Sequence, residues 1–139
     1  MVHSWVLARS DRARSWELFC EALNSDIEDI QGGTTPEGIH LGAMAGTVEL
    51  ITRCYTGIEV RERTLRFNPC LPQELGKLHM HARYLGHSLE IDVSSDKLKI
   101  SSLKSVVDPI RVVCDGEEFE LAPGETKEIN LRDKSRSCD

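Results

Sequence analysis

The chain has 139 residues, enough for one compact domain or for two small units of one protein. Its formal net charge of −6 argues against a nucleic-acid partner, which is usually bound through a basic face. No apolar run approaches the roughly 18 residues of a membrane-spanning helix, and the amino terminus lacks the order of segments in a signal peptide, so we expect a cytoplasmic protein with no membrane partner.

Residues 1–56 carry the sequence patterns of helices. The stretch HSWVLARS, residues 3–10, predicts a short first helix. A second helix is predicted from Asp11 to Leu23, with Ser10 or Asp11 as its N-cap. Apolar residues recur on it at spacings of three and four, and they predict a buried face made of Ala13, Trp16, Phe19, Cys20 and Leu23.

An irregular connection, residues 25–35, leads to a third predicted helix. That helix begins near Pro36, because Thr35 suits the N-cap and proline is favoured at the first helical position. It ends at Thr56-Gly57, where Gly57 suits the C-cap. Its glycines recur at every fourth position, although each costs about 1 kcal/mol relative to alanine; these are Gly38, Gly42 and Gly46. Such a stripe predicts close contact with a neighbour, so we expect the helices to be the end of a larger helical array.

After Gly57 the period of the apolar residues changes from that of helices to two. This alternation continues through seven or eight short segments, which predict an antiparallel β-sandwich over residues 57–133. Asp115-Gly116 and Pro123-Gly124 are turn signals between them. Residues 134–139 are a polar tail. The predicted class is therefore α+β, with helices at one end of a small sandwich.

The chemistry that the sequence offers is concentrated at the start of the third helix. A helix amino terminus favours an anion through its free N–H groups and its dipole, and the hydroxyls of Thr34 and Thr35 add donors. His40 lies about one turn inside the helix. It is either a ligand of an oxyanion or a sugar hydroxyl, or a buried histidine with hydrogen-bond partners. Glu37 is either an acceptor for a sugar hydroxyl or a carboxylate stabilised by the helix dipole.

Catalytic and metal-binding motifs are missing from the sequence. Asp26, Glu28 and Asp29 form an acidic cluster, but Ser25 beside them indicates a solvated turn or a helix cap rather than a general acid. His79 and His81 alternate outward on a predicted strand, and no third ligand accompanies them, so we expect surface histidines. The five cysteines form no CxxC pair, and neither structural zinc nor a disulfide framework is expected. We expect no catalytic residue, no metal and no cofactor in this chain.

Three stretches together resemble the carboxyl-terminal end of glycoside hydrolase family 65: HSWVLAR, FCEALNSDIEDIQGGTTPEGIHLGAMAGT and YTGIEVRERTLRFNPCLP. The similarity is good over residues 2–93 and weak beyond them, and EGIHLGAMAGT is its most specific part. The family contains maltose, trehalose and kojibiose phosphorylases and related hydrolases. The resemblance implies that residues 1–56 are the last helices of an (α/α)6 barrel and that a small β-sandwich follows them.

The resemblance also implies a function. The family cleaves an α-glucosidic disaccharide with inversion, and its phosphorylases use inorganic phosphate as the nucleophile. The histidine of the EGIH motif lies at the phosphate site and matches His40; Thr34, Thr35, Glu37 and Gly38 flank it. No position here matches the general-acid glutamate. We therefore expect a fragment or a subunit that is inactive without a chain carrying the rest of the barrel.

A free-standing β-sandwich module that binds carbohydrate or another protein is the alternative function. Sugar-binding surfaces usually expose aromatic rings. Here both tryptophans lie in the helices, and Phe67, Tyr84 and Phe119 fall on the predicted core faces of the strands. The distribution of aromatic residues therefore favours the fragment or subunit over the module.

Overall fold

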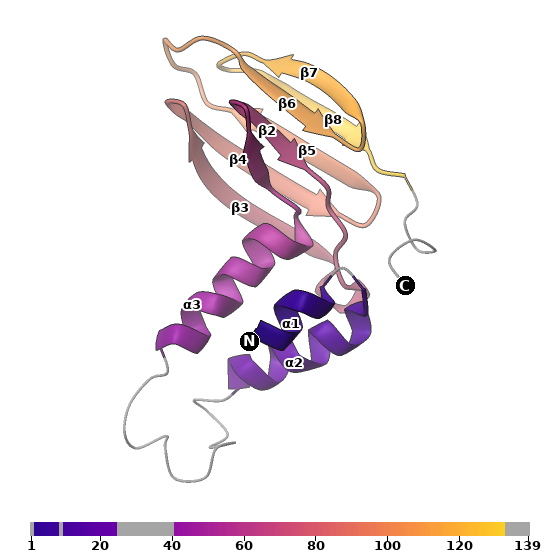
Figure 1. Cartoon of the computed structure of the whole chain (residues 1–139). Coiled ribbons are helices and arrows are strands. Elements are labelled where there is room, and N and C mark those ends of the chain that lie inside the picture. Colours follow the sequence, from indigo (N-terminus) through magenta and orange to yellow (C-terminus); the bar gives the residue numbers. More distant parts are fainter. Residues whose placement is uncertain (1, 9, 25–40, 133–139) are drawn as a thin grey trace. The chain divides into compact units, whose positions relative to one another are not determined.

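The structure, a computed structural model, describes residues 2–8, 10–24 and 41–132. It divides into two compact units at the bond between Tyr55 and Thr56 (Figure 1). The described part of the first unit is helical, and the second is built on strands, which confirms the α+β class. None of the described helices is long and apolar enough to cross a membrane.

The helical unit contains α1 (Val2–Leu7), α2 (Arg12–Asn24) and α3 (Leu41–Glu49), and α3 continues as a π-helical segment, η2 (Leu50–Tyr55). The second helix begins where it was predicted to begin, because the Asp11 carboxylate accepts a hydrogen bond of 3.0 Å from the Arg14 amide. The predicted start of the third helix near Pro36 lies outside the described residues. Its end at Tyr55 agrees with the prediction to within a residue.

The predicted apolar face of α2 is partly wrong. Phe19 is buried, and Trp16 and Cys20 are half-buried, but Ala13 and Leu23 are exposed. The fully buried residue in the first half of α2 is Ser15. The difference arises because α2 packs against α1 through a pair of serines, which the apolar periodicity does not register.

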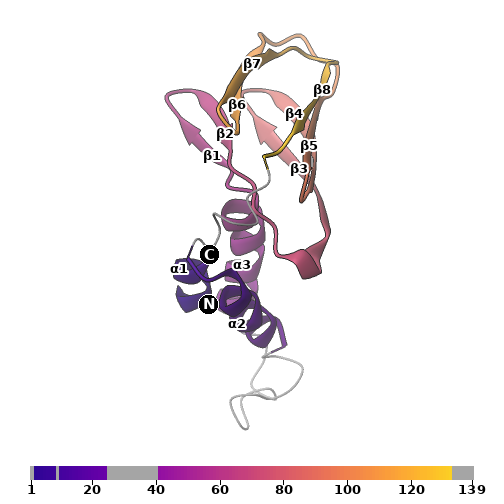
Figure 2. The same cartoon turned by 90° about the vertical axis from the view of Figure 1, so that its right-hand side faces the viewer.

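The second unit is a sandwich of two four-stranded sheets, which face one another in Figure 2. One sheet has the order β1-β2-β6-β7 and the other β3-β4-β5-β8. The strands are β1 (Glu59–Arg61), β2 (Thr64–Phe67), β3 (Lys77–Tyr84), β4 (His87–Ser94), β5 (Lys97–Ser102), β6 (Ile110–Cys114), β7 (Glu117–Leu121) and β8 (Thr126–Asn130). A 3-10 turn, η3 (Gln73–Leu75), precedes β3. The predicted sandwich is confirmed with one exception to antiparallel pairing: β2 and β6 are parallel, with Thr64 opposite Arg111.

The core of the sandwich lies between the two sheets and follows the predicted alternation. Inward-facing residues from both sheets form it, among them Leu65, Leu89, Ile91, Leu98, Ile100, Val112 and Leu121. Phe67 is buried there, and Tyr84 and Phe119 pack against it. Val60 departs from the expectation, because β1 is a short edge strand and this side chain is 58% exposed.

Two-residue turns connect three of the hairpins. Residues 62–63, 85–86 and 115–116 all have positive φ at both positions, the backbone of a type I′ turn. The Asp115-Gly116 signal is confirmed. At Pro123-Gly124 the Glu125 amide donates to the Ala122 carbonyl at 3.1 Å, so this signal is confirmed as well. The turn at residues 62–63 contains no glycine, and the sequence does not reveal it.

Gly57 is held in a conformation that only glycine tolerates at that place. Its φ is +61°, as expected for a C-cap, and a Cβ there would lie 2.4 Å from the carbonyl oxygen of Asn68. The expectation of no disulfide framework meets one exception among the described residues: Cys70 is disulfide-bonded, whereas Cys20, Cys54 and Cys114 form no disulfide.

Candidate functional site

The residues proposed for the site lie outside the described part of the chain. Thr34, Thr35, Glu37, Gly38 and His40 all belong to residues 25–40. His40 immediately precedes Leu41, the first described residue of α3. The structure therefore informs on the site through α3, the helix that follows these residues, and through the side chains that contact α3.

Both ends of α3 carry apolar side chains that the described residues leave exposed. The side chains of Leu41 and Val48 are 75% and 62% exposed. A Cβ built at Gly42 would meet no described atom within 4 Å. The close neighbour that the glycine stripe predicts is therefore not supplied at Gly42 by the described residues, and that neighbour stays a prediction.

A buried polar network joins the three helices. The Ser4 hydroxyl of α1 donates to the Ser15 carbonyl of α2 at 2.7 Å, and the Ser15 hydroxyl donates to the Ser4 carbonyl at 2.8 Å. The Ser15 hydroxyl also lies 3.3 Å from the Tyr55 hydroxyl at the end of η2. Because the three side chains are buried and bonded to one another, they fix the line of α3 relative to α1 and α2.

An aromatic cluster adds packing to the same junction. Trp16 and Phe19 stack with ring centroids 5.1 Å apart, and Tyr55 lies 6.2 Å from both. Burial raises the pKa of Tyr55 above its ordinary value, although the hydrogen bond with Ser15 acts in the opposite direction. Burial likewise lowers the pKa of the nearby Arg12. Apolar periodicity does not mark Ser4, Ser15 or Tyr55 as buried; their role is to position the helix.

In the sandwich, His87 is a buried histidine with a partner on each ring nitrogen. Its Nδ1 lies 2.7 Å from the Ser102 hydroxyl, and its Nε2 lies 2.9 Å from the Asp108 carbonyl. A carbonyl can only accept, so Nε2 carries a proton. This residue ties the connection before β6 to β4 and has a structural role.

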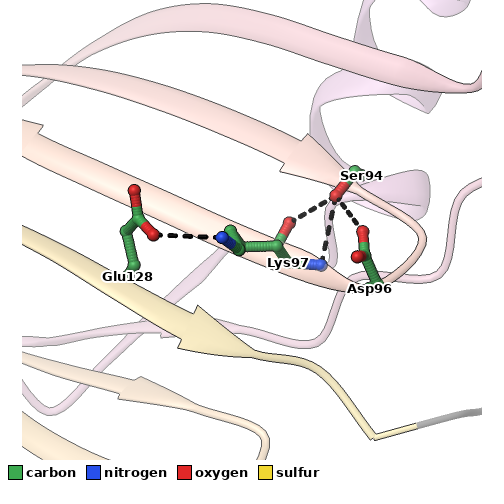
Figure 3. Close-up of polar contacts among 4 residues, drawn as sticks. All are labelled: Ser94, Asp96, Lys97 and Glu128. Carbon is green, nitrogen blue, oxygen red and sulfur yellow. Dashed lines mark hydrogen bonds and ion pairs between the residues drawn. The ribbon is translucent and has the colours of Figure 1, made fainter.

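Polar side chains cover the outer face of the β3-β4-β5-β8 sheet. Two shallow hollows of about 280 and 310 Å³ lie on it, one lined by His81 and the other by His79. Lys97 pairs with Glu128 at 3.1 Å, and Ser94 bonds both Asp96 and the backbone of Lys97 (Figure 3). The prediction that His79 and His81 are exposed is confirmed. Among residues 2–8, 10–24 and 41–132, no group of three or more histidine, cysteine or acidic side chains is arranged to hold a metal ion.

Comparison with solved structures gives the fold. The chain is similar to a provisionally named kojibiose phosphorylase from the human microbiome, with a TM-score of 0.77 at 19% identity. The match covers 93% of this chain and 17% of that one. A helical unit followed by a β-sandwich is thus an arrangement already present within a much longer protein.

Comparison of sequences gives the family. Residues 1–49 match the central catalytic domain of glycosyl hydrolase family 65, and residues 58–121 match its C-terminal domain. The chain belongs to glycosyl hydrolase family 65, and it spans the junction between these two domains.

Individual relatives agree with this assignment. An uncharacterized glycosyl hydrolase of Mycobacterium tuberculosis is 43% identical over 93% of this chain, which is 10% of that protein. The trehalose 6-phosphate phosphorylase of Lactococcus lactis is 33% identical over 84% of the chain and 15% of its own length. The kojibiose phosphorylase of Caldanaerobacter subterraneus is 29% identical over 80% of the chain and 14% of its own length. The chain therefore spans only a small part of the length of its curated relatives, and it is related to disaccharide phosphorylases.

Proposed function

We propose that residues 34–40 contribute part of the phosphate site of a family 65 enzyme that acts on an α-glucosidic disaccharide. The observation that carries the proposal is the match of residues 1–49 to the family's catalytic domain, because this match includes the EGIH motif. In the proposed site His40, which directly precedes α3 in the sequence, donates a hydrogen bond to a phosphate oxygen. Thr34 and Thr35 add hydroxyl donors, and Glu37 and Gly38 complete the segment.

The chemistry of the proposed reaction explains why an enzyme with this phosphate site needs no catalytic base. Phosphate is an anionic nucleophile, so it needs orientation and charge compensation rather than deprotonation. The leaving oxygen still needs a general acid, and that acid would come from the rest of the barrel. Inorganic phosphate is then a co-substrate, no cofactor is required, and the partner of this chain is the remainder of the catalytic domain.

The first test is the activity of the 139-residue chain by itself. Incubation with phosphate and maltose, trehalose or kojibiose should release no glucose 1-phosphate, because no residue in the chain is expected to supply the general acid. Measured turnover by the purified chain would show that this division of roles is wrong.

The second test combines the chain with the missing part of a barrel. The chain is co-expressed with the 43% identical relative shortened before the segment that matches it, and glucose 1-phosphate is measured across the same disaccharides. His40→Ala should raise KM for phosphate at least tenfold, with a smaller effect on KM for the sugar, and His40→Gln should restore part of the loss. His3→Ala, an exposed histidine of α1, is the matched control. An unchanged KM for phosphate in His40→Ala would reject the assignment of this residue.

A further inference from the structure

Two histidines stand side by side on the outer face of β3. Successive side chains of a strand point to opposite faces, so His79 and His81 share the face turned away from the sandwich core. Their Nε2 atoms are 3.3 Å apart, and their rings meet edge to face with centroids at 4.9 Å. Both are exposed to solvent, so an ion reaches them without any rearrangement of the core.

The position of the protons on this pair follows from a third residue. Asp92 lies directly across from His79 on β4, and its carboxylate oxygen is 2.7 Å from His79 Nδ1. An ionised carboxylate only accepts hydrogen bonds, so Nδ1 of His79 carries the proton. The Nε2 atom of the neutral ring then has a free lone pair, which accepts the N–H of His81 Nε2.

We propose that His79 and His81, with Asp92 behind them, form a binding site for a divalent transition-metal ion. Two imidazole nitrogens bound at about 2.05 Å to one tetrahedral ion lie about 3.3 Å apart, which is the separation found between the two Nε2 atoms. The ion takes the place of the proton that the two nitrogens share. The proton of His81 then moves from Nε2 to Nδ1 of the same ring. Both imidazoles stay neutral when the ion binds.

Asp92 supplies the outer hydrogen bond that metal-binding histidines commonly have. It fixes the tautomer of His79 and holds the ring in the orientation that presents Nε2 to the ion. Its partner across the next strand pair is Lys99, and Glu90 lies across from His81. Acidic and basic groups therefore surround the pair together, so the affinity comes from the nitrogens rather than from a concentration of negative charge.

The ligand set defines the class of ion. Imidazole suits zinc, copper and nickel, whereas magnesium and calcium prefer oxygen. Two protein ligands leave positions open to water, because the described residues hold no cluster of three or more ligands. The site is thus an exchangeable one, with copper bound more tightly than nickel or zinc.

The test is a titration of the 139-residue chain with zinc chloride, followed by NMR of the imidazole nitrogens. Cys20→Ser and Cys54→Ser remove two half-buried thiols that compete for zinc. Zinc should shift the Nε2 resonances of His79 and His81 together, at one ion per chain, and leave those of buried His87 in place. Magnesium chloride at the same concentration should shift none of them.

Variants measured by calorimetry assign the ligands. His79→Ala or His81→Ala should weaken zinc binding at least tenfold, and Asp92→Asn about tenfold, the usual effect of losing an outer partner. His3→Ala, the matched control, should bind as the parent does. The proposal is overturned if zinc leaves either Nε2 resonance unchanged, if both alanine variants keep the parental affinity, or if one ion binds two chains. The resonances of the parent decide the matter even where a variant is poorly folded.

Discussion

The two units bury their interiors in different ways. The sandwich closes an apolar core between its sheets, and residues of both sheets such as Ile91 and Val112 are fully buried. Among its described residues the helical unit buries only a few apolar side chains, such as Phe19 and Leu50, beside the bonded group of Ser4, Ser15 and Tyr55. Val6, Leu41 and Val48 remain exposed. The sandwich therefore has what a small domain needs to fold alone, whereas the helices match only part of a larger catalytic domain.

The largest expected effect comes from separating the units. A chain of residues 56–134 should unfold in one cooperative transition, because its apolar core is complete. A chain of residues 1–55 should show low helicity and no cooperative transition, since the few apolar residues buried in its described part cannot offset the entropy of ordering the chain. Circular dichroism during thermal unfolding measures both. A cooperative transition in residues 1–55 would contradict the contrast between the units.

Gly57→Ala should be the most damaging single substitution in the sandwich. The added Cβ would meet the Asn68 backbone at a residue whose φ is +61°, so we expect unfolding to become easier by about 3 to 5 kcal/mol. Gly116→Ala is the matched control: its φ is +87°, but a Cβ there meets nothing within 4 Å, and only the backbone cost of about 1 kcal/mol remains. Urea denaturation compares the two. Equal losses would show that the close approach to Asn68 does not matter.

A smaller effect is expected at the polar junction of the helices, and it depends on pH. Burial raises the pKa of Tyr55 above its ordinary value of 10.0, so the folded helices hold this proton more tightly than the unfolded chain does. Their stability is fully present below pH 10 and is lost as the pH rises through the folded pKa. Tyr55→Phe should cost about 1 kcal/mol at neutral pH, from the lost bond to Ser15, and should remove this alkaline loss. Helicity measured in the whole chain against pH tests both points. An alkaline loss of helicity as large in the Phe variant as in the parent would assign it to other groups.

The smallest expected effect lies in the turn between β4 and β5. The Ser94 hydroxyl donates to the Asp96 carboxylate at 2.7 Å, and this bond is the main reason why the pKa of Asp96 is below its usual value (Figure 3). The carboxylate therefore adds a small stability above its unfolded pKa, and this is lost as the pH falls through the folded pKa. Ser94→Ala should move the pKa of Asp96 upward, which carboxyl NMR measures, while Ser101→Ala should leave it unchanged. A pKa of Asp96 that stays low in Ser94→Ala would assign the shift to the backbone.

The sandwich was largely predictable because each strand alternates in a way that one buried face imposes. The residue types of Asp115-Gly116 and Pro123-Gly124 predict the turns at these two places. The parallel pairing of β2 with β6 was not predictable, since alternation says which face is buried but nothing about which strand lies alongside. The turn at Glu62-Arg63 escaped because nothing in the residue types signals the positive φ there.

The helical unit was less predictable for a physical reason. Apolar periodicity finds buried hydrocarbon, but α1 and α2 meet through Ser4 and Ser15, whose burial is stabilised by hydrogen bonds. Apolar spacing alone also predicts that Ala13 and Leu23 are buried, but both are exposed. The EGIH segment is recognisable from its motif, and residues 1–49, which contain it, match the catalytic domain of the family.

The parallel pair in the first sheet also has a consequence for how the molecule forms. β2 joins β6 only after the chain has passed through β3, β4 and β5 in the opposite sheet. After β1 and β2 have been made, the β2 edge that pairs with β6 has no partner strand until β6 is made much later in synthesis. Such non-local closure slows folding, and the waiting edge is the surface on which newly made chains would pair with one another before the sandwich is complete.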